Sequence, residues 1–529
     1  MSGQENVDAT QNGGESPGAR WGAAVPTEDE RQAKEAMRIA QKRSGASESP
    51  ARQPAVRLGA LPLGMLGVAI ALVLLWRVAV MAGLSGDVFW QWTAGQWMLA
   101  HHRLMTRDVF SYTVFGRRWV TEEWGYEVLL AALRAWWGPL AFWMMSAGVA
   151  SLAVIVAVAR MRRQGNSWTW VGLMAVVVGV SVALFMRDRP QTVSYLFFAL
   201  ELWLLDRARQ RPRTLYVLPP MLLVWANLHG SFLLALLVLL LEGVWALVPL
   251  HWGRLAVSRP LPRRDIWLTV AASFAAAMLN PHGPGLFAYA YHVSSNPEIA
   301  NNIGEWLSPN FHQLDEMLVV AGPILLTVLA ISVRTGTVEW SDMVLAGGLL
   351  VATLQSARFM PYFDIAWVGF YGWLDKPLDL NRTRPTRLTP VVAAGLAIWL
   401  LHGPTVPAGT PYHEPVAAAN FLRHQPGRVF TRYRWGDYMI HRHILVFIDG
   451  RTDLYVGTGV FSTYLKLKSL SINPDVVFQR YHIDWVVWPT GWALSTFLEH
   501  DPAWRLVMDR GGALVFARVA GHPLVGAPS

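Results

Sequence analysis

Long apolar runs separated by short polar segments are the main pattern of this chain. Several of these runs are about 17–22 residues long, which is enough to cross the hydrocarbon core of a membrane. About eleven of them are predicted to be spanning helices, near 58–83, 139–160, 168–186, 191–205, 215–227, 231–249, 266–280, 316–333, 342–357, 361–375 and 389–402. The pattern is typical of an α-helical polytopic membrane protein.

Two regions depart from this pattern. Residues 1–57 are rich in Gly, Ser, Glu, Gln and Arg, which predicts a disordered tail. Residues 403–529 alternate helix-like runs with short strand-like runs, which predicts a small α/β domain. The strands are expected in RVFTRY, ILVFID, DWVVWP, WRLVMD and GALVFA. Between the tail and this domain, a transmembrane domain is expected at 58–402, with a long first loop at 84–138.

Composition supports a membrane protein and excludes some chemistry. Of the 529 residues, 53% are hydrophobic and only 15% are charged, against roughly 25% in soluble domains. The net charge is +9, but the basic residues lie in short loops between apolar runs, so we expect no nucleic-acid partner. The chain has no cysteine, which excludes disulfides, thiolate catalysis and cysteine-ligated zinc.

The distribution of basic residues predicts the orientation in the membrane. If the N-terminal tail is cytoplasmic, the inner loops hold 16 Lys and Arg residues and the outer segments hold 8. Positive charge favours the cytoplasmic side, so this orientation is the expected one. An odd number of spans then places residues 403–529 outside the cell membrane.

Polar side chains collect at the ends of the runs that this orientation places outside. Polar groups at membrane depth are costly and usually face a cavity or a partner, so the pattern predicts one polar cavity that opens outward. The residues expected to line it are Gln191, Asn227, His229, His282 and Glu305, with Arg187, Arg189 and Arg358 at the same span ends.

The first loop carries acidic and aromatic residues together. Its sequence, SGDVFWQWTAGQWMLAHHRLMTRDVFSYTVFGRRWVTEEW, occupies 85–124. Large apolar residues at helical spacing predict an interfacial helix near 89–102, and a second helix is expected near 121–137. The four candidate catalytic acids of the loop are Asp87, Asp108, Glu122 and Glu123.

These residue types suit a glycosyltransferase that uses a lipid-linked donor. A carboxylate can take the proton of an acceptor, a role for Asp87 or Asp108. Guanidinium groups bind phosphate in a fork, a role that suits Arg187, Arg189 and Arg358. We expect Arg189 and Arg358 to converge on one anionic site near Asp87. A transporter and a non-catalytic scaffold for envelope assembly are the alternatives. No internal repeat of the kind common in transporters is visible, and a scaffold would not explain the one-sided polar residues.

The sequences of several segments resemble those of a known superfamily. The first-loop sequence, together with RPQ, WANLHG, EWLSPNFH and ARFMPYF, is similar to a bacterial branch of the GT-C membrane glycosyltransferases, over roughly residues 60–460. The resemblance implies a polyprenyl-phosphate sugar donor, a glycan, lipid or protein acceptor, and catalysis at the outer face of the plasma membrane. It also implies that the loop aspartate, here Asp87, acts as the base or as a metal ligand.

Two features leave the assignment of the base and of the cofactor open. Many relatives have two adjacent acids where this chain has Asp87 followed by Val88, so Asp108 and the Glu122–Glu123 pair compete for the role. Some GT-C enzymes use Mg²⁺ or Mn²⁺ and others do not, and Asp87 would be the metal ligand.

Structural roles compete with these functional interpretations. Asp87 can cap the helix that follows it, and Asp108 can serve as a turn residue. Glu122 and Glu123 suit the first turn of a helix. In the C-terminal domain, Asp449 follows an apolar strand where α/β folds place ligand groups, but an Asp449–Arg451 pair that holds a turn would explain the same residues.

Overall fold

The computed structural model describes most of the apolar region and the C-terminal region. The described residues are 28, 29, 32, 63–84, 86–186, 188–248, 251–252, 255–256, 260–333, 338–370 and 414–519. Except for residues 28, 29 and 32, the predicted tail at 1–57 lies outside them. The predicted span at 389–402 lies entirely outside them.

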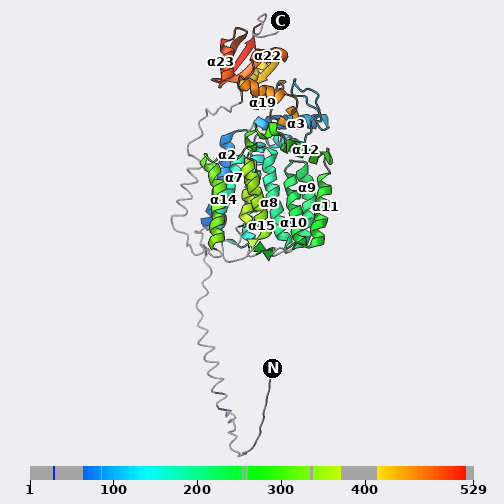
Figure 1. Cartoon of the computed structure of the whole chain (residues 1–529), viewed down its shortest axis with the longest axis vertical. Coiled ribbons are helices and arrows are strands. Elements are labelled where there is room, and N and C mark those ends of the chain that lie inside the picture. The colour runs from blue at the N-terminus through cyan, green and yellow to red at the C-terminus, as the bar shows by residue number, and fades with distance from the viewer. Residues whose placement is uncertain are drawn as a thin grey trace, which may run out of the picture. The chain divides into compact units, whose positions relative to one another are not determined.

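A bundle of long helices forms from the apolar runs (Figure 1). Its helices are α2 (Leu63–Ala82), α6 (Val149–Arg163), α7 (Trp168–Phe185), α8 (Pro190–Ala208), α9 (Leu218–Ala226), α10 (Phe232–Leu247), α11 (Arg263–Ala277), α14 (Leu314–Val333), α15 (Trp340–Gln355) and α16 (Met360–Phe370). Shorter helical segments adjoin them at α5 (Leu140–Trp143), η1 (Met144–Gly148), η2 (Pro212–Val217) and η4 (Ala357–Phe359).

Small residues bring α2 and α7 into close contact. A Cβ added at Gly64 would lie 1.4 Å from the Trp168 carbonyl oxygen, and one at Gly67 would lie 2.4 Å from the Gly172 carbonyl oxygen. Larger side chains would therefore separate the two helices, and glycine at these positions allows backbone-to-backbone packing.

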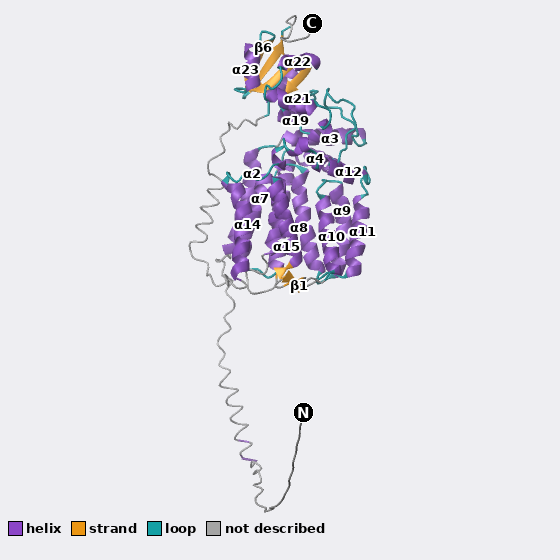
Figure 2. Cartoon of the chain, viewed as in Figure 1, coloured by secondary structure: helices purple, strands orange, loops and turns teal. Residues whose placement is uncertain are grey.

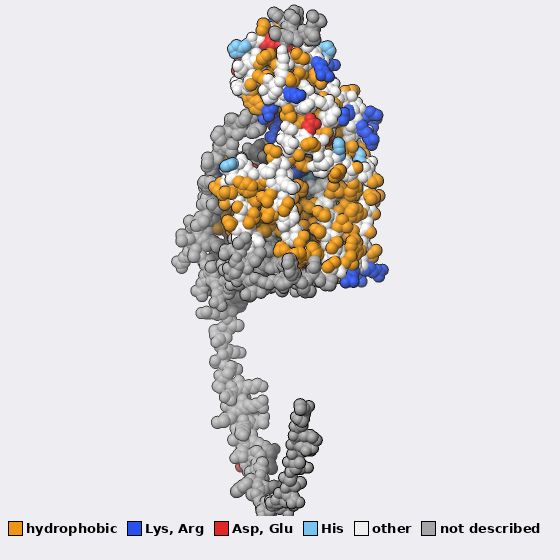
Figure 3. Space-filling model, viewed as in Figure 1, with side chains coloured by type: hydrophobic (Ala, Val, Ile, Leu, Met, Phe, Trp, Pro, Cys, Tyr) orange, Lys and Arg blue, Asp and Glu red, His pale blue; other side chains and the backbone are white. Residues whose placement is uncertain are grey.

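Three described helical stretches are long and apolar enough to cross a membrane: Gly64–Met81, Leu140–Arg163 and Trp168–Phe185. A total of about eleven spans remains a prediction. Hydrophobic side chains dominate the visible face of the bundle, and Lys and Arg side chains lie toward its ends (Figure 3).

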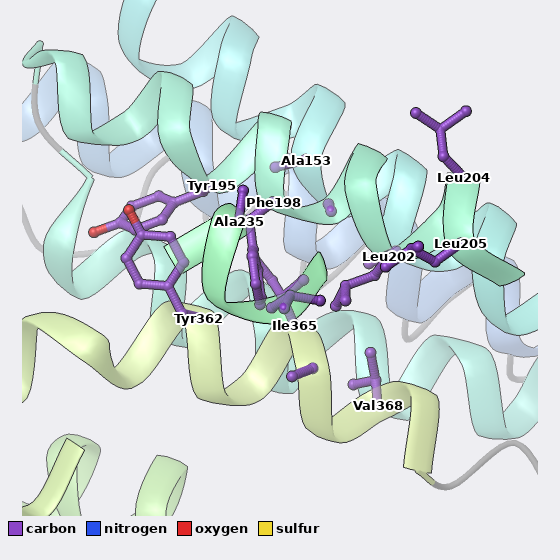
Figure 4. Packing of buried hydrophobic residues seen from close by; sticks show 14 of the residues in the cluster. Ala153, Tyr195, Phe198, Leu202, Leu204, Leu205, Ala235, Tyr362, Ile365 and Val368 are labelled. Carbon is purple, nitrogen blue, oxygen red and sulfur yellow. The ribbon is translucent and has the colours of Figure 1, made fainter. Parts of the chain in front are cut away.

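The bundle core is apolar and well packed. Tyr195 and Phe198 of α8 lie against Tyr362 of α16, with ring centroids 5.1 and 5.3 Å from that of Tyr362, and Leu202 and Ile365 continue the contact (Figure 4). This core fixes the first turn of α8, which carries residues of the site described below.

At one end of the bundle, the loops fold into short helices (Figure 2). The first loop forms α3 (Gly86–His101) and α4 (Trp124–Trp137), close to the two helices expected there, and the later loops form α12 (Gly285–Ser294), α13 (Pro297–Ala300) and η3 (Gly304–Trp306). At the other end, β1 (His251–Trp252), β2 (Leu255–Ala256) and β3 (Val338–Glu339) form a small sheet.

The C-terminal region is a four-stranded sheet with helices. Its strands β4 (Arg428–Thr431), β5 (Ile483–Pro489), β6 (Trp504–Arg510) and β7 (Ala513–Arg518) follow the order β4-β5-β7-β6, with β4 and β5 parallel and the other pairs antiparallel. Its helices are α18 (Val416–Leu422), α19 (Tyr433–His441), α20 (Thr452–Tyr455), α21 (Val460–Lys468), α22 (Pro474–Arg480) and α23 (Ala493–His500).

The predicted strand ILVFID is wrong. Val446 forms only isolated bridges, one to Val429 and one to Ser111 of the first loop. Its backbone N–H donates to the Phe110 carbonyl and its carbonyl accepts from the Tyr112 N–H. The segment is apolar because it is buried between β4 and the first loop, and not because it extends the sheet.

The first loop and the C-terminal region share one hydrophobic core. Helix α3 packs on α19, where the ring centroids of Phe89 and Tyr438 are 5.0 Å apart and those of Trp92 and His441 are 4.2 Å apart. The two parts, more than 300 residues apart in sequence, therefore position each other's side chains.

Candidate active site

Three segments distant in sequence converge on an ion-paired centre. Asp87 stands in the first turn of α3, Arg189 immediately precedes α8, and Glu305 lies in η3. Asp87 Oδ2 is 2.6 Å from Arg189 Nε, and Arg189 Nη1 donates a 2.6 Å hydrogen bond to Glu305 Oε1. The guanidinium thus bridges two carboxylates.

The Asp87 carboxylate is largely buried beside the Arg189 guanidinium. Its side chain is 20% exposed. Burial raises its pKa above the ordinary value, and so do Glu305 and Asp449, while Arg189 opposes the shift. A base with a raised pKa binds a proton more strongly, which favours general-base catalysis.

A second carboxylate, Asp437 of α19, approaches the same point and was missed by the sequence analysis. It is fully buried. Its Oδ1 accepts a 2.6 Å hydrogen bond from the Gly450 N–H, whereas Oδ2 has no hydrogen-bond partner among the described residues. A Cβ at Gly450 would lie 2.6 Å from Asp87 Oδ1 and 2.8 Å from Asp437 Oδ1, so both carboxylates line the space beside this glycine.

The environment of Asp437 favours its neutral form. Burial and the neighbouring charges of Asp87 and Asp449 raise its pKa well above the usual range. Like charges in a buried pair cannot both ionise at low cost. The sequence marks this residue only by a glycine–acid pair inside a mixed polar and apolar segment, and nothing local connects Asp437 to Asp87.

The acids at the start of α4 lie nearby but have different partners. Glu123 Oε2 accepts a 3.0 Å hydrogen bond from Gln91, and Oε1 is 3.8 Å from His229 Nε2. Burial, followed by the charge of Arg358, lowers the pKa of His229 to about 3, so its ring is neutral. Burial, followed by the charge of Asp453, raises the pKa of the partly exposed Glu122 to about 7. These acids flank the centre and do not touch it.

The polar residues expected to line a cavity mostly hold loops together. Asn227 accepts a 3.0 Å hydrogen bond from Trp124 Nε1, which joins α9 to α4. His229 Nδ1 is 2.9 Å from Ser194 Oγ. His282 Nε2 is 3.3 Å from the Thr121 carbonyl oxygen. Gln191 is buried in the first turn of α8.

Asp108 belongs to a buried structural network. It is fully buried and accepts hydrogen bonds from the Phe110 N–H, the Ser111 N–H and Ser111 Oγ. Arg451 Nη2 is 2.7 Å from Asp108 Oδ1 and 2.7 Å from Asp449 Oδ2. The Asp449–Arg451 pair forms as the structural alternative expected, with Asp108 as an additional partner. This geometry favours a structural role for all three residues.

Arg358 lies at the edge of the centre. Its guanidinium is 4.4 Å from the ring centroid of Trp306, the residue after Glu305, and it forms no ion pair with a described carboxylate. Arg189 and Arg358 therefore converge on η3, one through Glu305 and the other through Trp306. Arg187 lies outside the described residues.

A hollow beside the centre is lined mainly by apolar side chains. It lies between α2, α5 and the segment before α8, with Leu84, Trp143, Met186 and Asp188 among its walls, and it has room for about one water molecule. Asp188 directly precedes Arg189 in the sequence, but Asp87, Arg189 and Glu305 are not among the residues that line this hollow.

The centre does not fit a divalent metal ion. The described residues hold no group of three or more His, Asp or Glu side chains placed to bind one. The Asp87 and Glu305 oxygens that face inward are each 2.6 Å from a nitrogen of the Arg189 guanidinium. Asp437 offers one oxygen without a hydrogen-bond partner among the described residues, which is a single ligand and not a coordinating set.

The fold is similar to that of two solved membrane glycosyltransferases. The archaeal oligosaccharyltransferase AglB from Archaeoglobus fulgidus, in complex with an inhibitory peptide and a dolichol-phosphate, aligns with a TM-score of 0.56 and 11% identity, over 88% of this chain and 74% of that chain. ArnT from Cupriavidus metallidurans, bound to undecaprenyl phosphate, aligns with a TM-score of 0.51 and 13% identity, over 86% of this chain and 98% of that chain. No family model and no curated protein matches the sequence.

Proposed function

We propose, from the premise that this chain has the fold of the GT-C membrane glycosyltransferases, that it transfers a sugar from a polyprenyl-phosphate donor to an acceptor. The observation that carries the proposal is the Asp87 carboxylate, held by Arg189 at the loop end of a bundle with this fold. Both structural neighbours were captured with a polyprenyl phosphate, which supports a lipid-linked donor.

Asp87 acts as the general base in this proposal. A hydroxyl or amine of the acceptor attacks the anomeric carbon and loses its proton to Asp87. The bond from that carbon to the phosphate oxygen breaks, and the polyprenyl phosphate leaves with the bonding electrons. Removal of a general base typically slows a reaction about 10²–10⁴-fold.

Arg358 is the proposed ligand of the donor phosphate. It has no carboxylate partner among the described residues, and an unpaired guanidinium binds phosphate through two parallel hydrogen bonds. Arg189 already pairs with two acids, so its charge stabilises the carboxylates first.

The loop end of the bundle is the extracytoplasmic side in this proposal. The support is the excess of Lys and Arg in the segments at the other end. Single cysteines introduced at Ser16 and Ser462 can be treated with a membrane-impermeant reagent in intact cells. We expect labelling at residue 462 and protection at residue 16, and the opposite pattern would reverse the topology.

The experiment that tests the reaction uses purified protein and a panel of polyprenyl-phosphate sugars. The measured quantity is polyprenyl phosphate released in the presence of glycan, lipid and protein acceptors. We expect release with at least one donor and acceptor combination. Absence of release across the panel, from protein that remains folded, would count against the proposal and favour a transporter or a scaffold.

A further inference from the structure

We propose that the Arg189 guanidinium takes the place of a divalent cation between Asp87 and Glu305, and that the transfer reaction needs no metal ion. The part concerning catalysis rests on the proposed function. The part concerning cation binding does not, and it can be measured on the protein alone.

The first support is the bridging geometry. Arg189 Nε lies 2.6 Å from Asp87 Oδ2 in an ion-pair contact that is not a hydrogen bond, and Nη1 donates a 2.6 Å hydrogen bond to Glu305 Oε1. The two carboxylates come from α3 and η3. A single cationic group therefore joins two distant segments, which is the structural task that a metal ion performs when it is held by carboxylates.

The second support is the rigid placement of the guanidinium. Arg189 adopts an extended backbone, with φ −125° and ψ 156°, directly before Pro190 at the start of α8. A residue that precedes proline is restricted to this region. The side chain is only 20% exposed, so both the backbone and the surrounding atoms keep the charge at the centre.

The third support is the electrostatic cost of adding a second cation. Mg²⁺ binds carboxylate oxygens at about 2.0–2.1 Å. An ion on Asp87 would lie close to the guanidinium, which remains charged at every accessible pH. The attraction of one carboxylate would then be offset by repulsion from Arg189, and the described residues provide no set of three ligands to compensate.

The chemical consequence concerns Asp87. A guanidinium holds the orientation of the carboxylate without coordinating it, so Oδ1 stays available toward Gly450 and Asp437. A metal ligand would instead lose basicity. Arg189 in this role is a positioning residue for Asp87, and lysine should replace it poorly because an ammonium is a point charge and not a planar fork.

The first experiment measures Mn²⁺ binding by electron paramagnetic resonance on purified wild type, Arg189→Ala, Arg189→Lys and Arg118→Ala. Arg118 is an exposed arginine of the same loop, which makes Arg118→Ala the matched control. We expect no stoichiometric site in wild type, Arg118→Ala or Arg189→Lys. We expect one site in Arg189→Ala, with a Kd on the order of 10⁻⁴ M, because two carboxylates lose their cation. That site should disappear when Glu305→Gln is added.

The second experiment compares turnover before and after dialysis against a chelator. We expect unchanged turnover in wild type, and a larger loss in kcat than in KM for Arg189→Lys. A stoichiometric Mn²⁺ site in wild type, or turnover that is lost on chelation and restored by Mn²⁺, would overturn the proposal, as would an Arg189→Ala protein that is folded and binds no Mn²⁺. If no donor is turned over but the Mn²⁺ contrast is found, the proposed function fails and the cation replacement stands.

Discussion

Replacing Asp108 with asparagine tests whether this residue has a structural role or a catalytic one. In the structure, four donor groups contact the two carboxylate oxygens of Asp108, including Arg451 Nη2 at 2.7 Å and Ser111 Oγ at 2.7 Å. Asparagine keeps one acceptor oxygen and turns the other into a donor. The variant therefore loses a hydrogen bond to a charged group, worth about 1.5–3 kcal/mol, and leaves at least one buried donor unsatisfied, at about 1–3 kcal/mol.

The expected loss of stability is about 3 kcal/mol, because Arg451 retains Asp449 as a partner and part of the network can relax. With an unfolding entropy of roughly 2 cal/mol/K per residue, that loss lowers the Tm of the described chain by about 3 °C. The assay is thermal unfolding in detergent, followed by turnover per folded molecule at low temperature. Asp449→Asn is the matched control, since it breaks the same network from the other side.

The structural interpretation predicts that Asp108→Asn and Asp449→Asn both unfold at a lower temperature, while folded molecules of Asp108→Asn turn over at the wild-type rate. A different result would refute it. If Asp108→Asn keeps the wild-type Tm and loses about 10²-fold or more in rate, the loss would match removal of a general base, and the catalytic role would move from Asp87 to Asp108.

Three further predictions test neighbouring parts of the account. In Gly450→Ala, the new methyl group would lie 2.6 Å from Asp87 Oδ1 and 2.8 Å from Asp437 Oδ1, so we expect a fall in kcat with a small change in KM; an unaltered kcat would contradict the proximity of the two acids. Burial raises the pKa of the fully buried Glu127 to about 8, against 4.5 for the free side chain. The stability that its protonated form contributes is therefore complete below pH 4.5 and lost as the pH rises through 8, so Glu127→Gln should raise the Tm relative to wild type at pH 9 and not at pH 4.5. The limit is about 1.4 kcal/mol per pKa unit, and an equal effect at both pH values would argue against the shift. Arg358→Lys should raise the KM for the donor because an ammonium cannot form the bidentate contact; an unchanged KM would restrict Arg358 to packing on Trp306.

The sequence predicts the local features of this protein better than its long-range contacts. Helix α7 follows directly from the apolar run at 168–186, and α3 from the spacing of its aromatic residues, because both patterns reflect which face a helix buries. The segment ILVFID has the composition of a strand but is buried by contact with the first loop. Apolar composition alone cannot distinguish these two causes of burial.

The same limit applies to the site. Asp87, Arg189 and Glu305 were each identified as candidates, because each is a polar residue next to an apolar run. Their pairing was not predicted, since it depends on how three loops fold over the bundle end. Asp437 was not predicted as a site residue, because its position near Asp87 depends on the packing of α19 on α3 and on the space beside Gly450.

The central claim is that Asp87 takes the proton of the acceptor in a sugar transfer from a polyprenyl phosphate. The most direct measurement is the rate of polyprenyl phosphate release by purified wild type and Asp87→Asn, with the donor and acceptor pair that wild type turns over. The account predicts a rate about 10²–10⁴-fold lower for Asp87→Asn, measured per folded molecule at a temperature below the Tm of the variant. Release by folded Asp87→Asn at the wild-type rate would contradict it.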